Sequence, residues 1–323
     1  MKAMIRDAYG PPDVLELREI DIPEIADDEV LVRVHAAGVG RDVLHVMTGL
    51  PYPIRLAGYG FRAPKNLVIG SDVAGVVDAV GKNVRRFLPR DEVFGIGKGS
   101  YAEYVSARED KLAHKPANLT FEQAAVIAIM GSTALQALRD HGKVRQGQEV
   151  LIIGASGGVG TYAVQIAKAF GAHVTGVCST KKVEMVRSIG ADHVIDYTRE
   201  DFAEGDQRYD VILDIGGNST LAHLRRALTQ QGTLVIIGGE GSGRWLGGTD
   251  RQLRAMILSP FVGQKLGTFV NKENHEDLIV LGGLIESGKV TPVIDRTYPL
   301  AEVPEAIRYL EEGHARGKVV ITV

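Results

Sequence analysis

A glycine-rich turn at residues 154–160, with the sequence GASGGVG, is the segment best suited to chemistry. Gly157 would let the backbone approach a pyrophosphate, and Gly160 would let the following helix pack closely on the preceding strand. Amide groups at the start of that helix favour an anion. The turn therefore predicts dinucleotide binding, with an ordinary tight strand-to-helix turn as the alternative. The predicted contacts are Ala155, Ser156, Gly157, Gly158 and Val159.

The residues around this turn must position it. An apolar run at 150–153 is typical of a buried parallel strand, and residues 158–169 follow a helical pattern. Strands and helices continue to alternate to about residue 289, which predicts an α/β fold with a doubly wound parallel sheet. Gly216 and Gly238 follow two later strands, at the carboxyl edge where ligands of such sheets bind.

The end of the second predicted strand bears on the choice of cofactor. The chain there reads Cys178 and Ser179, then Thr180, Lys181 and Lys182, with no carboxylate to hold a ribose 2′-hydroxyl. Hydroxyl and ammonium groups suit a 2′-phosphate, so NADPH is favoured over NADH. The alternative is that Thr180 caps the next helix and the lysines are solvated. Cys178 is interpreted as a small strand residue rather than a nucleophile.

The remaining parts of the chain show other patterns. Residues 1 to about 115 contain short strand-like runs, which predict a partly open antiparallel barrel. Residues 121–142 read as one helix, with Thr120 as N-cap and Gln123 three residues later. The tail from residue 291 reads as strand, helix and strand, and we expect it to fold back onto the N-terminal part.

Composition narrows the class of protein. The chain has 323 residues, of which 45% are hydrophobic, so a substantial core is available. A net charge of −3 argues against nucleic acid as a partner. No apolar run of membrane-spanning length occurs, and the single cysteine excludes an internal disulfide. A soluble cytoplasmic protein with no membrane partner is expected.

Several motifs together resemble the medium-chain dehydrogenase/reductase superfamily, in its zinc-independent quinone oxidoreductase-like branch. They are AAGV at 36–39, GSDVAGVV at 70–77, GGVG at 157–160, GAD at 190–192 and GKVV at 317–320. The resemblance implies a GroES-like catalytic domain at 1–120 and 290–323 and a Rossmann domain at 121–289. It also implies a cleft between the domains, a homodimer, and hydride transfer from NADPH to a quinone or an α,β-unsaturated carbonyl compound.

The resemblance also implies roles for particular residues. Positions matching Ser179, Lys182 and Tyr197 hold the 2′-phosphate end of NADPH in the resembling reductases, and Lys318 matches a position near the pyrophosphate. The zinc-ligand positions of the zinc alcohol dehydrogenases carry Gly40, Ser71 and Asp72 here, and no cysteine lies near residues 129–131. No catalytic metal is therefore expected, because zinc needs three good ligands.

Three residues are candidates for supplying a proton. Asp42 and His45 occupy places that match a proton relay in the zinc enzymes, and His titrates near neutrality. The alternative is a solvated Asp42 with His45 packed on a helix face. Tyr52 could stabilise an enolate and donate its proton, or its ring could only line an apolar pocket. Tyr59 is a weaker candidate. Arg41 could reach the cofactor phosphates or be a surface arginine, and Trp245 and Leu246 could shape the pocket.

Two other functions stay open at this point. A metal-free alcohol dehydrogenase or carbonyl reductase could use the Asp42 and His45 pair. A non-catalytic NADPH-binding protein would bind the cofactor without turnover.

Overall fold

The computed structural model describes residues 1–238, 249–313 and 315–323, and it contains two compact units. The first unit is built from Met1–Ser132, Lys272–Glu286 and Pro292–Val323, and the second from Thr133–Asn271 and Ser287–Thr291. The glycine-rich segment at 239–248, including the pocket candidates Trp245 and Leu246, lies outside the described residues.

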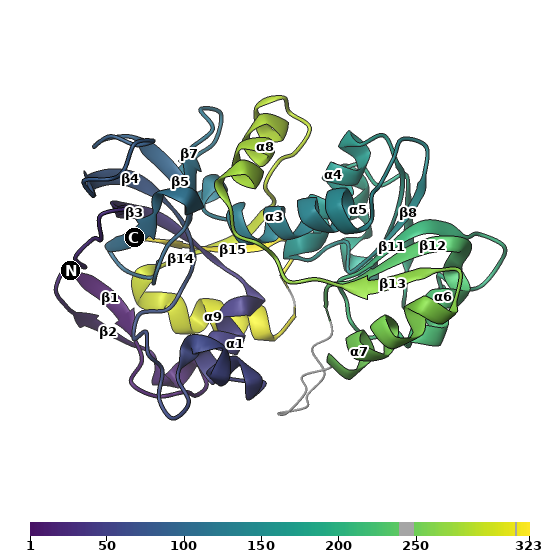
Figure 1. Ribbon diagram of the computed structural model, residues 1–323, viewed down its shortest axis with the longest axis horizontal. Coiled ribbons are helices and arrows are strands. Elements are labelled where there is room, and N and C mark those ends of the chain that lie inside the picture. Colours follow the sequence, from purple (N-terminus) through teal and green to yellow (C-terminus); the bar gives the residue numbers. More distant parts are fainter. Residues whose placement is uncertain (239–248, 314) are drawn as a thin grey trace. The chain divides into compact units, whose positions relative to one another are not determined.

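The second unit contains a six-stranded sheet in which all described pairings are parallel (Figure 1). The strand order is β10-β9-β8-β11-β12-β13, so the order reverses direction between β8 and β11. This is the doubly wound arrangement that the sequence predicts, and a ligand of such a sheet binds outside the reversal. The strands are β8 (Glu149–Ile153), β9 (His173–Cys178), β10 (His193–Asp196), β11 (Tyr209–Asp214), β12 (Leu228–Ile236) and β13 (Lys265–Thr268).

Helices cover both faces of this sheet. Figure 1 shows α4 and α5 on one side and α6 and α7 on the other. Leu224 and Ala255 from the latter pair pack against Leu151, Leu234 and other sheet residues in a buried apolar cluster. Alternate residues of a strand face opposite sides, so the continuous apolar runs supply both cores. The helices are α4 (Gly158–Ala169), α5 (Val183–Ser188), α6 (Leu221–Ala227) and α7 (Thr249–Leu258).

The first unit contains a seven-stranded sheet and a separate two-stranded sheet. The strand order of the seven-stranded sheet is β14-β15-β3-β4-β5-β7, and β6 also pairs with β3. Every pairing is antiparallel except β14 with β15. The strands are β1 (Lys2–Ile5), β2 (Glu16–Glu19), β3 (Glu29–Val39), β4 (Asp72–Val80), β5 (Glu92–Ile96), β6 (Tyr104–Arg108), β7 (Leu112–His114), β14 (Ile294–Pro299) and β15 (Lys318–Thr322).

The C-terminal tail completes the first unit, as predicted. Strand β15 pairs with β3 in an antiparallel register that places Val320 opposite Gly38. Helix α9 (Val303–Glu311) buries Val303 and Ile307 in one apolar cluster with Val319. The other helices of this unit are α1 (Arg41–Thr48), α2 (Phe121–Ala124) and α8 (His275–Glu286).

The single helix predicted over 121–142 is wrong. Thr120 and Gln123 do form a capping box, but α2 ends at Ala124 and a new helix, α3 (Ala128–Gln136), begins after a short turn. The break leaves amides at the start of α3 that need acceptors. The carboxylate of Asp72 accepts one of them, from Ile129 at 2.9 Å, and this distant partner could not be read from local sequence.

The helical pattern of residues 221–231 is longer than the helix that forms there. Helix α6 stops at Ala227, and β12 begins at Leu228, whose backbone is extended. Leu228 is buried in the sheet core, so tertiary packing overrides the helical pattern there.

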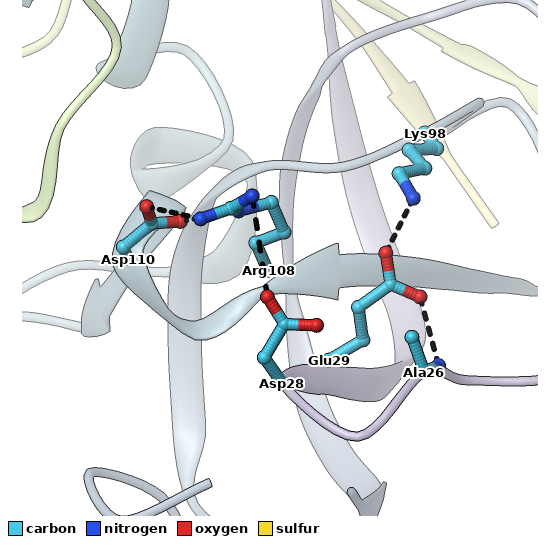
Figure 2. A network of polar contacts seen from close by, with 6 residues as sticks. All are labelled: Ala26, Asp28, Glu29, Lys98, Arg108 and Asp110. Carbon is cyan, nitrogen blue, oxygen red and sulfur yellow. Dashed lines mark hydrogen bonds and ion pairs between the residues drawn. The ribbon is translucent and has the colours of Figure 1, made fainter. Parts of the chain in front are cut away.

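A polar network fixes the start of β3 against its neighbours (Figure 2). Glu29 is buried, accepts the amide of Ala26 at 3.1 Å and pairs with the Lys98 amine. Arg108 lies opposite Glu29 in the β3–β6 register and binds Asp110 at 2.9 Å. The Glu29 carboxylate is paired on both sides, so it tolerates burial in this position.

Candidate cofactor site and buried ionisable cluster

The second unit has a cavity of about 750 Å³ at the carboxyl edge of its sheet. Residues after four strands line it, so it lies where doubly wound sheets bind their ligands. Its lining mixes backbone of glycine turns, hydroxyl groups and charged side chains of both signs. The lining residues used below are Gly154, Ser156, Cys178, Ser179, Lys182, Tyr197, Arg199 and Gly216.

The glycine turn has the geometry that its sequence predicts. Gly154 has φ +88°, a conformation that favours glycine, and Gly157 is the N-cap of α4. A Cβ at Gly160 would lie 2.1 Å from the Gly154 oxygen, so only glycine permits this close approach of helix and strand. A Cβ at Gly157 would meet Gly154 O at 3.5 Å and nothing closer, so the backbone is accessible there.

The other predicted turn residues occupy distinct positions. Ala155 is fully buried and Ser156 is 7% exposed, although Ser156 lines the cavity. Gly158 and Val159 open helix α4, so their amides belong to its free N-terminal donors. These amides can bind an anionic ligand.

The same cavity is lined by Ser179, Lys182 and Tyr197. Ser179 precedes a short 3₁₀ helix, η5 (Thr180–Lys182), and the Lys182 amide donates to the Ser179 carbonyl at 2.9 Å. Tyr197 follows β10, and its side chain is exposed. The structure thus brings together two loops that are far apart in the sequence.

Thr180 does not cap the next helix. Its hydroxyl donates to Asp196 Oδ2 at 2.5 Å, and it lies 3.1 Å from the Thr198 hydroxyl. Asp196 also accepts the Thr198 amide at 3.0 Å and the Thr198 hydroxyl at 2.8 Å. The Thr180 hydroxyl, followed by Thr198, holds the pKa of Asp196 below its ordinary value. This carboxylate ties the loop after β9 to the loop after β10.

The glycines after β11 and β12 are positioned by an ion pair that the sequence did not reveal. Asp214 is fully buried and lies 2.6 Å from the Arg251 guanidinium, which also donates to Gly238 O at 2.9 Å. The Gly217 amide donates to Asp214 Oδ1 at 3.1 Å. Burial raises the pKa of Asp214, and Arg251 opposes that rise. This pair therefore holds the loops that carry Gly216 and Gly238.

Cys178 is buried beside this cavity. Burial raises its pKa to about 11, so the thiol stays protonated at neutral pH. A protonated, buried thiol is a poor nucleophile, in agreement with its interpretation as a strand residue.

The first unit contains a separate cluster of buried ionisable groups. Lys318 opens β15 and is 2% exposed, and its Nζ lies 3.7 Å from Asp72 Oδ2. Nζ has no hydrogen-bond partner among the described residues. Asp72 opens β4 and is also buried. The predicted cofactor residue Lys318 is thus an ion-pair partner of Asp72 within this unit.

Gly38 in β3 and Gly40 directly after it leave space for carboxylates in this cluster. A Cβ at Gly38 would lie 3.1 Å from Asp72 Oδ2, and one at Gly40 would lie 2.2 Å from Asp42 Oδ1. The two glycines are two residues apart on an extended segment, so they face the same side. This arrangement places Asp42 and Asp72 side by side next to Lys318.

The burial and closeness of these groups shift their pKa values. Burial raises the pKa of Asp72 to about 7, against the opposing charge of Lys318, and Asp42 raises it further. Burial also raises the pKa of Asp42, which Lys318 again opposes. Tyr101 donates to Gly38 O at 3.1 Å, and burial raises its pKa well above the usual range. The cluster is therefore suited to holding protons at neutral pH.

The other candidate proton donors lie on or after α1. His45 Nδ1 lies 2.9 Å from the Leu50 carbonyl, and this contact fixes the ring. The Arg55 guanidinium lies 5.1 Å from the centre of the half-buried Tyr52 ring. Tyr59 is 38% exposed, and burial raises its pKa. Arg41 is exposed at the start of α1.

Metal ligands and membrane spans were also sought. Among the described residues, no group of three or more His, Cys, Asp or Glu side chains could hold a metal ion. Within the same described residues, no helix has the length and apolar character needed to cross a bilayer.

Comparison with protein families and solved structures gives a consistent result. A family model described as "Alcohol dehydrogenase GroES-like domain" matches residues 26–117, and one described as "Zinc-binding dehydrogenase" matches residues 189–321. The chain is similar to the mitochondrial NAD(P)H oxidoreductase RTN4IP1 of Mus musculus, with 36% identity over 100% of this chain and 89% of that protein.

Two further similarities bear on the chemistry. The chloroplastic NADPH-dependent alkenal/one oxidoreductase of Arabidopsis thaliana is 36% identical over 99% of this chain and 79% of its own length. The solved structure of the quinone oxidoreductase from Coxiella burnetii has a TM-score of 0.87 and 31% identity, covering 100% of this chain and 99% of that one.

Proposed function

The chain belongs to the medium-chain dehydrogenase/reductase superfamily, in its quinone oxidoreductase-like branch, and we propose that it transfers hydride from NADPH to a quinone or an α,β-unsaturated carbonyl compound. The names of its relatives place it among oxidoreductases that use a nicotinamide cofactor. The choice of NADPH, the proton donor and the acceptor are the finer parts of the proposal.

The cavity at the carboxyl edge of the second unit carries this proposal. Its turn offers open backbone at Gly157, and the free amides of α4 suit a pyrophosphate. Ser179 and Lys182 supply a hydroxyl and an ammonium group for a 2′-phosphate. A ribose-binding acid after β9 would instead favour NADH, and this chain has serine there. The described residues therefore fit NADPH.

The bound cofactor supplies a hydride, and the protein must supply a proton and orient the acceptor. With an enone, hydride adds to the β-carbon and a proton adds to the α-carbon of the resulting enolate. With a quinone, hydride transfer gives the hydroquinone monoanion, and one proton completes the hydroquinone. Tyr52 can donate a hydrogen bond to the acceptor oxygen. Asp42 can hold the proton, because burial raises its pKa, and His45 can pass a proton from water.

Two observations support a homodimer. Strand β13 is the last strand of its sheet, and its outer edge is unpaired among the described residues. Val270 follows it with 87% of its surface exposed. An exposed strand edge can pair with the same edge of a second copy. We also propose that the catalytic domain comprises 1–120 and 290–323 and the cofactor domain 121–289. The proposed location is the cytoplasm, although two relatives are named as mitochondrial or chloroplastic.

The test is oxidation of NADPH by the purified protein with quinones and enals, with metal content measured on the same sample. We expect turnover with NADPH, weaker binding of NADH, and turnover that survives a chelator. Oxidation of secondary alcohols without quinone reduction would instead support the metal-free alcohol dehydrogenase. Cofactor binding with no turnover over the whole panel would contradict an enzyme. Tyr52→Phe is expected to lower kcat about tenfold or more while leaving NADPH affinity unchanged.

A further inference from the structure

The cavity that Ser179 and Lys182 line is also lined by an arginine with no assigned role. Arg199 lines the cavity two residues after Tyr197, and 72% of its side chain is exposed. Its backbone amide donates to the Asp196 carbonyl at 2.9 Å, so the residue is anchored although its side chain extends into solvent. A cation held at a cavity rim in this way can contact an anionic ligand.

The side chain of Arg199 is held only loosely. Its Nε lies 3.6 Å from Asp196 Oδ2, beyond the length of a strong charge-assisted hydrogen bond. An exposed ion pair of this kind contributes little to stability. Asp196 does not depend on it, because Thr180 and Thr198 already donate hydrogen bonds to both carboxylate oxygens. The guanidinium can therefore leave Asp196 at little cost.

The carboxylate of Asp196 also positions the Arg199 side chain before a ligand binds. Oδ2 of Asp196 accepts the hydroxyl of Thr180, which directly follows Ser179 in the chain. Arg199 and the hydroxyl-bearing loop thus share one oxygen atom as a neighbour. A phosphate bound by Ser179 and Lys182 would lie in the cavity that Arg199 also lines.

A 2′-phosphate carries close to two negative charges at neutral pH. Lys182 provides one cation, and the acidic residues Glu200 and Glu204 on the same lining would oppose the phosphate. A second cation is needed to offset them, and arginine can bind phosphate through two parallel hydrogen bonds. We propose that Arg199 is a specificity-determining residue that leaves Asp196 and clamps the 2′-phosphate of NADPH opposite Lys182. This inference rests on the proposed use of NADPH.

The experiment measures binding to the full-length protein by calorimetry, with NADPH, NADH, 2′,5′-ADP and 5′-AMP as probes. The variants are Arg199→Gln and Arg199→Lys. Arg187→Gln is the matched control, because Arg187 is 57% exposed, pairs with Glu184 at 2.7 Å and does not line the cavity. The ADP and AMP probes separate recognition of the 2′-phosphate from contacts with the nicotinamide half.

We expect Arg199→Gln to weaken NADPH and 2′,5′-ADP about tenfold and to leave NADH and 5′-AMP unchanged. Arg199→Lys is expected to recover part of the loss. Unchanged NADH affinity also reports that the variant is folded. If Arg199→Gln and Arg187→Gln lost the same NADPH affinity, the role assigned to Arg199 would be overturned. The proposed use of NADPH would still stand. A parent protein that binds 5′-AMP as well as 2′,5′-ADP would overturn the NADPH proposal and the assignment with it.

Discussion

Two aspartates, one in each unit, sit in opposite electrostatic environments although both are largely covered. The side chain of Asp196 is 9% exposed and that of Asp72 is 3% exposed. Hydrogen bonds from Thr180 and Thr198 lower the pKa of Asp196, whereas burial raises the pKa of Asp72 to about 7. Coverage alone therefore does not set the charge of a carboxyl group. Burial dominates at Asp72, whereas the hydrogen bonds from Thr180 and Thr198 dominate at Asp196.

The difference suits the two regions to different tasks. Around Asp196, hydroxyl groups and the side chains of Lys182 and Arg199 line a cavity, as anion binding requires. Around Asp72, a buried amine and a second carboxyl group share little solvent, which favours holding a proton. The predictions below change residues of these two regions, and all but the glycine pair use the other region as the control.

The largest effect on stability is expected from removing Lys318, and removal of Lys182 is the control in the cofactor region. Lys318→Met leaves the buried Asp72 without its amine partner, and breaking a buried pair costs about 3–5 kcal/mol. The loss should be largest above neutral pH, because without Lys318 the pKa of Asp72 rises above its value of about 7 and the carboxyl takes up a proton in neutral and acidic solution. Lys182→Met is expected to keep the stability of the parent and to weaken NADPH. Urea unfolding followed by circular dichroism, together with NADPH titration, would check both variants.

A pair of glycines separates packing from ligand access in the cofactor region. Gly160→Ala places a Cβ 2.1 Å from a backbone oxygen, so α4 must move away from β8 at a cost of about 2–3 kcal/mol. Gly157→Ala meets nothing closer than 3.5 Å and is expected to fold like the parent while binding NADPH more weakly. The contrast would fail if Gly157→Ala lost as much stability as Gly160→Ala in the same unfolding measurement.

The two aspartates predict opposite dependences of stability on pH. The folded pKa of Asp72 lies above the unfolded value of about 4, so its contribution makes stability fall as pH rises from about 4 to 7, by at most about 1.4 kcal/mol per unit. Asp72→Asn should remove this part of the slope. Asp196 has a lowered pKa, so its contribution is present above about pH 4 and is lost as pH falls through the folded pKa.

The matched variant for that comparison is Asp196→Asn. It should be less stable than the parent at neutral pH, and the deficit should shrink in acid. The measurement is the difference in unfolding free energy between each variant and the parent, from urea unfolding at several pH values. If this difference changed with pH in the same direction for both variants, the result would contradict the opposite environments of the two aspartates.

The smallest effect concerns one hydroxyl in the buried cluster. Tyr101→Phe removes the hydrogen bond to Gly38 O and is expected to cost about 1 kcal/mol of unfolding free energy. Tyr197→Phe is the control in the cofactor region. Its exposed ring should leave stability unchanged, and a change of stability there would indicate a structural role instead.

Local sequence was sufficient wherever the interacting residues are near one another in the chain. The turn at 154–160 lies between a strand and a helix, and the capping box links Thr120 with Gln123 three residues on. The apolar runs also predicted a parallel sheet whose strands alternate with helices along the chain. Such features depend on backbone geometry that a short window determines.

Contacts between distant residues were not visible in the sequence. Asp72 binds the Ile129 amide 57 positions away, and Arg251 joins Asp214 across the sheet edge. Asp196 accepts a hydrogen bond from the Thr180 hydroxyl, for which a helix cap was the alternative interpretation. Each of these contacts depends on which strand ends meet in space, so residue type and spacing gave no indication of the partner.

The place of β15 in its sheet has a consequence for synthesis on the ribosome. This strand lies between β14 and β3, yet it consists of residues 318–322 and brings the buried Lys318 with it. Most of the first unit is translated early, but its sheet cannot close until these last residues leave the exit tunnel. The second unit, which ends at Thr291, can complete its own sheet sooner. During translation, the part of the chain that is made first is therefore expected to be finished last.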